Sequence, residues 1–247
     1  MLAAILHGKI PREVEDSEDL LTSVVFGALE RLPLHLGFRK LLALARGPQK
    51  PACWAEVVRV KVEYWPWCGE SDAFGGAEPD VVLTLEAPGH AKQVVVIEAK
   101  RGSGKSGHGD RDQLAREIDT AVVPHGAELG GLIYITADHT EPTDDLNASR
   151  AALARSRLRS GTPLWWLPWQ DLVPVLCAAH AADPSGAGTL ARDAARCLQR
   201  WGIEWFSGID AVKAVPAFRF HQTFSFGPLR TLPEYNFRTE VDDPIRH

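Results

Sequence analysis

Two short apolar runs separated by a turn form the clearest pattern along this chain. Residues 80–86 read Asp-Val-Val-Leu-Thr-Leu-Glu, and residues 93–100 read Gln-Val-Val-Val-Ile-Glu-Ala-Lys. The segment Ala-Pro-Gly-His at 87–90 between them is rich in turn-forming residues. Val- and Ile-rich runs that flank a turn are typical of strands, so the pattern predicts a β-hairpin whose turn is centred near Gly89.

The predicted hairpin brings two acids and a lysine to one end of the sheet. Asp80 lies opposite Glu98 in this register, and opposed residues project from one face with Cβ atoms roughly 5 Å apart. Lys100 is two residues beyond Glu98 and projects from the same face. Two close carboxylates repel each other unless a cation joins them, and a hard divalent cation takes oxygen ligands. The alternative is a salt-bridged strand end at a solvated sheet edge.

The remaining pattern predicts helices and strands around this hairpin. A helix is expected from Asp16 or Ser17 to Arg31, because apolar residues recur there at helical spacing. Alternation predicts a half-buried strand over 58–64 with its valines inward. Further helices are predicted at 112–123, 146–158, 170–182 and 190–201, and the first of them has Leu114, Ile118 and Val122 on one stripe. Strands are predicted at 131–138 and 164–169, and a linker at 183–188. We therefore expect one core over residues 1–183 and a C-terminal appendage over 184–247, partly helical, otherwise irregular and aromatic-rich.

Composition narrows the class of protein. The chain has 247 residues, 45% of them hydrophobic, which is enough for one substantial core. Its four cysteines form no C-x-x-C pair, so we expect no zinc site or disulfide framework and a reducing, cytoplasmic location. No apolar run approaches the ~20 residues of a membrane span, and we expect no signal peptide. The net charge of -5 disfavours non-specific coating of duplex DNA.

Pro79-Asp80, the hairpin and Glu98-Ala99-Lys100 together resemble the core of the PD-(D/E)XK nuclease superfamily, over roughly residues 17–138. The resemblance implies an α/β, restriction-endonuclease-like fold with a mixed β-sheet flanked by helices. It implies Mg²⁺ as cofactor, with Mn²⁺ as an alternative. Asp80 and Glu98 match the metal-binding acids, and Lys100 matches the catalytic lysine.

Two further positions match the resemblance less specifically. Glu18 is the best placed acid on the first helix for a metal role, with Glu15, Asp16 and Asp19 as competitors. Gln113 matches a glutamine that many members carry on the helix after the motif strand, and would position Lys100 or a phosphate oxygen. The carbonyl group of Ala99 is a further candidate metal ligand.

Basic segments supply the candidate contacts to nucleic acid. Residues 101–110 contain Gly-Ser-Gly-Lys-Ser but lack the spacing of a phosphate-binding P-loop. They are interpreted either as a basic loop beside the metal site or as a solvated linker, and Arg101 and Lys105 are its candidate contacts. Arg150 and Arg157 belong to an acid-free stretch, with Arg155 and Arg159, that would hold phosphates or form a solvated helix face. Trp65 and Trp67 could stack on bases or anchor the core.

The expected function is hydrolysis of phosphodiester bonds, with DNA as the first candidate substrate and an endonuclease favoured over an exonuclease. RNA stays open as the alternative substrate, because the motif says nothing about a 2′-hydroxyl group. The resemblance alone suggests prokaryotic defence. A different class of function is also open: a nuclease-fold subunit, as a homodimer or with a partner subunit, whose main role is regulation or protein interaction. The acidic net charge and the alternating aromatic residues Phe218, Phe220, Phe224 and Phe226 motivate it. A sequence-specific restriction enzyme is the third interpretation.

Overall fold

The chain divides into two compact units, residues 1–206 and residues 207–247. The computed structural model describes residues 2–9, 18–69, 76–102, 104–107, 109–156 and 159–206, so every structural statement below concerns these ranges. The aromatic segment around residues 218–226 lies outside them. The helix predicted at 190–201, which we assigned to the C-terminal appendage, lies within the first compact unit.

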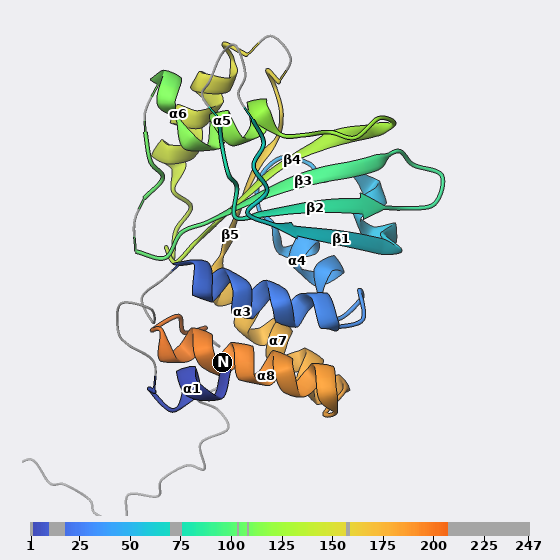
Figure 1. Cartoon of the computed structure of the whole chain (residues 1–247), viewed down its shortest axis with the longest axis vertical. Coiled ribbons are helices and arrows are strands. Elements are labelled where there is room, and N and C mark those ends of the chain that lie inside the picture. Colours follow the sequence, from blue (N-terminus) through green and yellow to red (C-terminus); the bar gives the residue numbers. More distant parts are fainter. Residues whose placement is uncertain are drawn as a thin grey trace, which may run out of the picture. The chain divides into compact units, whose positions relative to one another are not determined.

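One five-stranded mixed β-sheet organises the first unit (Figure 1). The strands are β1 (Arg59–Tyr64), β2 (Val81–Glu86), β3 (Lys92–Ala99), β4 (Ala127–Thr136) and β5 (Leu164–Pro168). Their order in the sheet is their order in the chain. The first three form an antiparallel meander, whereas β4 and β5 are added in parallel.

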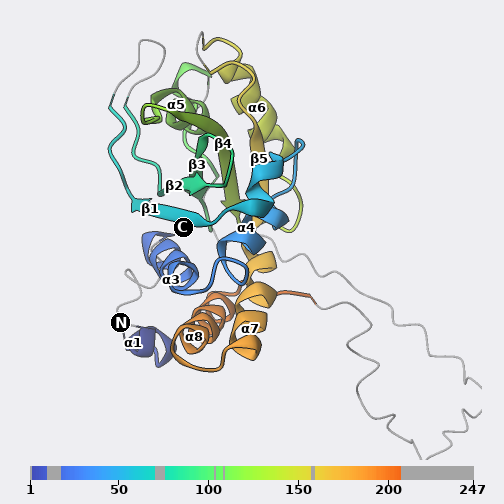
Figure 2. The ribbon, with the colours of Figure 1, turned by 90° about the vertical axis from the view of Figure 1, so that its right-hand side faces the viewer.

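Helices cover both faces of the sheet (Figures 1 and 2). The two crossovers, α5 (Gln113–Thr120) and α6 (Thr143–Leu153), lie on one face. On the opposite face, α3 (Glu18–Arg31) and α4 (Phe38–Leu44) lie next to the sheet, and α7 (Leu172–Ala182) follows β5. Helix α8 (Gly186–Arg200) packs on α3 and α7, farther from the sheet, and α1 (Leu2–Leu6) packs on α8. Short 3-10 helices occupy Ala52–Glu56, Gly109–Arg111 and Trp169–Asp171. The protein is thus an α/β structure whose mixed sheet is flanked by helices on both faces. No helix in the described ranges has the length and apolarity that crossing a membrane requires.

Burial on both faces explains why the central strands read as nearly continuous apolar runs. Along β3, Val95 and Ile97 pack into the core that α3, α7 and α8 share, whereas Val96 packs against Leu114 and Ile118 of α5. The alternation of side chains along a strand therefore supplies two separate cores. It also fixes which side chains at the strand ends face α5.

The elements that were predicted differ from the structure mainly at their ends. Val58 precedes β1 and Val122 follows the C-terminal end of α5, and both are exposed, so the prediction that they are buried is wrong. Helix α6 starts earlier and ends earlier than predicted. Helix α8 starts at Gly186, inside the predicted linker, because Gly188 lets its first turn approach the backbone of Asp183; a Cβ atom there would overlap the Asp183 carbonyl oxygen.

Candidate functional site

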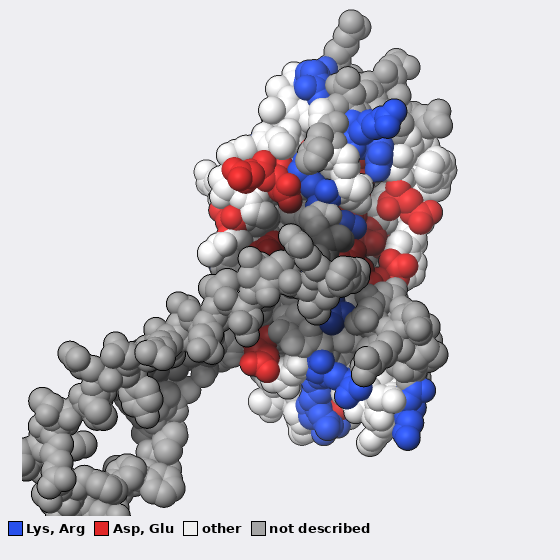
Figure 3. Space-filling view, turned by 90° about the vertical axis from the view of Figure 1, so that its left-hand side faces the viewer, with Lys and Arg blue, Asp and Glu red and all other residues white. Residues whose placement is uncertain are grey.

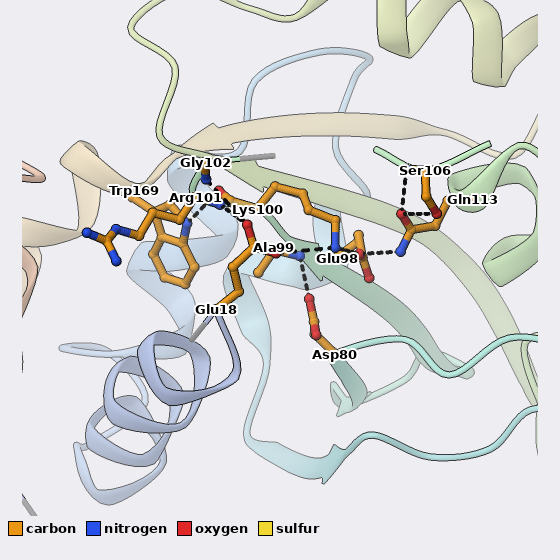
Figure 4. Close-up of polar contacts among 10 residues, drawn as sticks. All are labelled: Glu18, Asp80, Glu98, Ala99, Lys100, Arg101, Gly102, Ser106, Gln113 and Trp169. Carbon is orange, nitrogen blue, oxygen red and sulfur yellow. Dashed lines mark hydrogen bonds and ion pairs between the residues drawn. The ribbon is translucent and has the colours of Figure 1, made fainter. Parts of the chain in front are cut away.

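Asp80 and Glu98 lie where β2 begins and β3 ends. Val81 pairs with Ile97, which is the register predicted from the turn, and Gly89 adopts a φ of 75° at that turn. The side chains of Val81 and Ile97 point into the core between the sheet and α3. Their neighbours Asp80 and Glu98 therefore project toward the α5 face, and Figure 4 shows both carboxylates beside the end of β3.

Glu98 is held by two donors on one oxygen. The Lys100 Nζ lies 2.6 Å from Glu98 Oε1, and Gln113 donates from Nε2 to the same oxygen at 2.5 Å. Glu98 is only 1% exposed, so both contacts are made in a low-dielectric environment where they are strong. Glu98 thus has an orientation that Lys100 and Gln113 fix through one of its oxygens.

The orientation of the Gln113 amide follows from the loop that precedes α5. Its Oε1 accepts hydrogen bonds from the Ser106 backbone N–H at 2.9 Å and from Ser106 Oγ at 3.0 Å. The amide nitrogen must then face Glu98 (Figure 4). A buried ion pair between Lys105 and Asp112 holds the same loop, and Asp112 also caps α5 by accepting from the Ala115 N–H.

Asp80 is held by a backbone N–H group at the end of β3. Its Oδ2 accepts a 2.8 Å hydrogen bond from the Ala99 N–H. Burial, together with the negative charge of Glu98, raises the pKa of Asp80 to about 7, although the Ala99 hydrogen bond and Lys100 act in the opposite direction. A cation bound to both Asp80 and Glu98 would therefore offset the repulsion between the two carboxylates and the cost of burying their charges.

Lys100 stays charged in this environment. Burial opposes its charged form, but Glu98, Asp80 and Glu18 together outweigh that effect and raise the pKa of Lys100 to about 12. Glu18 lies on the first turn of α3, with its Oε2 3.6 Å from Lys100 Nζ. The lysine side chain retains 16% exposure, so its ammonium group borders solvent while it contacts the acids.

Hydrogen bonds connect the residues at the end of β3 to Glu18 of α3 and to Trp169. Glu18 Oε1 accepts from the Arg101 N–H at 2.8 Å and from the Gly102 N–H at 3.3 Å. The indole N–H of Trp169 donates to the Lys100 carbonyl oxygen at 3.1 Å. These contacts, visible in Figure 4, place Glu18 at the site but occupy one of its oxygens with backbone donors.

Glu117 is a site residue that the sequence analysis missed. It lies one turn after Gln113 on α5, is 1% exposed, and its Oε2 has no hydrogen-bond partner in the described ranges. Burial and the nearby Glu98 carboxylate raise the pKa of Glu117 well above its ordinary value. The sequence does contain a feature that could have identified Glu117: it is an acid three residues after Leu114, on the apolar side of the predicted helix.

Two cavities flank the backbone of Arg101 and Gly102. The first, which we call the acidic cavity, measures about 520 Å³ and borders Lys100. Its acids are Asp138, Glu141, Asp144 and Asp145, from the β4–α6 connection and the first turn of α6. The second, which we call the Trp201 cavity, measures about 500 Å³ and is lined by Glu18, Arg101, Gly102, Ala137, His139, Gln170, Trp201, Gly202 and Ile203.

Of the described residues that were predicted to contact nucleic acid, Arg101 lies at this site, whereas Lys105 and Arg150 do not. Arg101 lines both cavities, and its Nη2 donates to the Trp201 carbonyl oxygen. Lys105 is wrongly predicted as a contact, because its side chain is 1% exposed and paired with Asp112. Arg150 bonds to Asn147 and lines a separate cavity near Leu164.

Several other candidates fall outside the site or outside the described residues. Arg157, Glu15 and Asp16 are not described. Trp67 is 64% exposed, whereas Trp65 is half-buried with a φ of 46°. Figure 3 shows basic and acidic side chains interspersed on one face, with no continuous basic surface among the residues that it colours.

The raised pKa of Asp80 predicts a pH-dependent stability when divalent cations are chelated. A carboxyl group whose folded-state pKa is raised stabilises the fold fully below its ordinary value of 3.8 and loses that contribution as pH rises through about 7. Asp80→Asn removes the titration. The free energy of unfolding of the wild type, measured with urea, should therefore fall relative to that of Asp80→Asn as pH rises across this window. Parallel pH profiles would contradict the assignment.

Within the described ranges, no group of three or more His, Cys, Asp or Glu side chains is arranged to hold a metal ion. A cation at this edge would therefore rest on Asp80 and Glu98, completed by backbone oxygen and water. No protein-family model, curated protein or solved structure matches the chain.

Proposed function

We propose that this chain is a magnesium-dependent nuclease of the PD-(D/E)XK superfamily, with a restriction-endonuclease-like fold, and that it hydrolyses phosphodiester bonds in DNA. The observation that carries the proposal is the convergence of Asp80, Glu98 and Lys100 at one end of the β2–β3 hairpin. Simple salt bridging of a strand end accounts less well for this arrangement, because the acids are more buried than a solvated ion pair requires. Among the residues that the structure describes, Lys100 is the one ammonium group beside both acids.

The carboxylate oxygens fit a magnesium ion. Glu98 Oε1 and Asp80 Oδ2 already accept hydrogen bonds from the protein, and we propose Glu98 Oε2 and Asp80 Oδ1 as the atoms through which these residues would bind a cation. Magnesium ordinarily uses one or two protein carboxylates and keeps several waters. The Ala99 carbonyl group is a further proposed ligand, and Mn²⁺ would accept the same oxygens. When bound, the ion would stabilise charge on the scissile phosphate and lower the pKa of the attacking water.

The protein's own groups would orient the substrate and the ligands. Lys100 is protonated and acts as a cation that binds a phosphate oxygen or orients water, rather than as a general base. Gln113 fixes the Glu98 carboxylate, and Ser106 fixes Gln113. Glu18 would act mainly by anchoring the backbone at Arg101, with any contact to the cation made through its remaining oxygen.

An interaction role is the second candidate, and one observation favours it. Trp205 and Phe206, at the end of the first compact unit, are 46% and 80% exposed. Exposed aromatic side chains next to each other are a common feature of protein interfaces. In this interpretation the chain would be a nuclease-fold subunit that recruits or regulates a partner.

The deciding experiment incubates purified protein with linear, circular and single-stranded DNA and with RNA, in Mg²⁺, in Mn²⁺ or in a chelator. We expect cleavage of DNA with either metal and none in the chelator. Cutting of the circular form would identify an endonuclease. Absence of cleavage on all substrates with both metals would reject the nuclease and favour the interaction role.

A further inference from the structure

Helix α8 carries a row of like charges on its exposed side, which we call the arginine row. Arg192, Arg196 and Arg200 lie four residues apart, so they project from one side of the helix at intervals of about 6 Å. Arg196 and Arg200 are exposed, and the Arg192 side chain remains 43% exposed while it binds the neighbouring Asp193. The apolar residues of α8 are buried in the core that it shares with α3 and α7.

The stability of the helix does not explain this row. An arginine in the last turn interacts favourably with the helix dipole, and this accounts for Arg200 alone because the effect falls off within one turn. Like charges four residues apart repel each other and destabilise a helix slightly. The one acid of α8 is Asp193, in a chain whose net charge is -5. Three like charges on one side of the helix therefore fit an anionic partner.

The arginine row begins beside the candidate site. Trp201 follows Arg200 directly, and its carbonyl oxygen accepts a hydrogen bond of 3.3 Å from Arg101 Nη2. Arg101 is the residue after Lys100, and Figure 4 shows its guanidinium group pointing away from the Lys100 ammonium group. Helices α3 and α8 run in opposite directions in Figure 1, so the end of α8 lies beside the end of α3 that carries Glu18. The row thus continues the cations of the site along α8.

Charge favours this side of the site over the other. The acidic cavity carries four acids beside Lys100 and Arg101, namely Asp138, Glu141, Asp144 and Asp145. In the Trp201 cavity the acid among the lining residues is Glu18, which already accepts two backbone N–H groups and lies near Lys100. A polyanionic strand held at Lys100 is therefore repelled on the side of the acidic cavity and attracted on the side of α8.

We propose that Arg192, Arg196 and Arg200 bind phosphates of the nucleic-acid strand whose scissile phosphate lies at Lys100. The rise of four helical residues, about 6 Å, is close to the separation of successive phosphates along a strand. A membrane surface fits less well, because an interfacial helix exposes bulky apolar residues, whereas those of α8 are buried. This inference rests on the proposed nuclease function and gives the path of its substrate.

The first test measures binding in a chelator, so that no cleavage occurs. Fluorescence anisotropy follows labelled DNA at several salt concentrations, in whichever of the single-stranded and duplex forms binds the wild type more tightly. We expect Arg192→Gln with Arg196→Gln to bind about 10-fold more weakly and to reduce the logarithmic salt slope by about 1.4–1.8, since each lost phosphate contact removes about 0.7–0.9 from it. Affinity and slope equal to those of the wild type, or no binding of either form by the wild type, would overturn the proposal.

Two further variants separate phosphate contacts from general charge and from folding. Arg59→Gln removes the same charge from the exposed end of β1 opposite Glu86, away from Asp80, and should leave affinity and slope unchanged. Arg196→Lys keeps the charge and should keep the salt slope, whereas Arg196→Gln should lose about 0.7–0.9 of it. An equal loss of slope in Arg59→Gln, or in Arg196→Lys and Arg196→Gln alike, would overturn the proposal. Melting temperatures check that each variant is folded.

The remaining outcomes distinguish this inference from the other partner and from the proposed function. Arginine-dependent binding to vesicles of phosphatidylcholine and phosphatidylserine, without binding to DNA, would overturn the proposal. Cleavage of DNA in Mg²⁺ with unchanged rate and affinity in the double variant would leave the nuclease standing and reject the path along α8. Arginine-dependent DNA binding with no cleavage in Mg²⁺ or Mn²⁺ would support the path in a protein that binds but does not cut.

Discussion

Replacing Glu98 with alanine is expected to lower the rate of DNA cleavage by about 10³-fold or more while the protein remains folded. The physical reason is the loss of a cation ligand, since bound metal contributes several kcal/mol to the stability of the transition state and each 1.36 kcal/mol changes the rate about tenfold. The fold should tolerate the change, because removing Glu98 also removes its repulsion with Asp80 and Glu117. Initial rates of cleavage in Mg²⁺, with circular dichroism as the check on folding, measure the effect.

Three variants define the controls for this experiment. Asp80→Ala should show the same loss of rate as Glu98→Ala, because both acids are proposed ligands. Lys100→Ala should lose most activity yet still bind the cation, measured by calorimetry, since the lysine is not a ligand. Glu86→Ala replaces an acid on the same hairpin that pairs with Lys92 at the other end of β2, and should cleave like the wild type. Full activity in Asp80→Ala would reject the mechanism.

Replacing Lys105 with methionine is expected to destabilise the protein by about 3–5 kcal/mol. The Lys105 and Asp112 side chains are 1% and 0% exposed, so the variant leaves a carboxylate buried without its cation. In a chain of this size each kcal/mol shifts the melting temperature by roughly 2–4 °C, so a fall of about 10 °C is expected. Thermal and urea unfolding measure the change.

A second substitution separates charge from helix capping. Asp112→Asn retains an oxygen that can cap α5 at the Ala115 N–H but removes the negative charge. The double variant Lys105→Met with Asp112→Asn should be more stable than Lys105→Met alone, because no unpaired charge is then buried. A destabilisation below about 1 kcal/mol in Lys105→Met, together with weaker DNA binding, would instead restore the role in nucleic-acid binding that the sequence suggested.

Local patterns in the sequence predicted the part of the site that depends on short-range pairing. The turn at Gly89 and two Val-rich runs were sufficient to place Asp80 opposite Glu98, because strand pairing in a hairpin is set by the turn. Side-chain alternation then placed Lys100 on the same face. The roles of Gln113 and Glu18 came from resemblance, and the structure brings both to the site through contacts that the sequence did not specify.

Long-range burial explains what the sequence could not predict. Lys105 lies in a glycine-rich basic segment that resembles a solvated loop, and only its pairing with Asp112 in three dimensions makes it a buried structural residue. Glu117 is an acid in an amphipathic helix, a position that is ordinarily exposed. Helix α8 was separated from the core by a run of small residues at 184–188, yet its apolar face packs on α3 and α7.

Because the strands occur in the sheet in the order in which they occur in the chain, synthesis from the N-terminus supplies the strands of the site in the order in which they pair. Asp80 meets the Ala99 N–H across a separation of 19 residues, so this contact closes a short loop at low entropic cost. The hydrogen bond between Trp169 and the Lys100 carbonyl oxygen spans 69 residues and can form only once residue 169 has been synthesised. A ribosome-bound chain that ends before residue 169 already contains both acids and the lysine, and Glu18 that holds the backbone after them, but it lacks the hydrogen bond from Trp169.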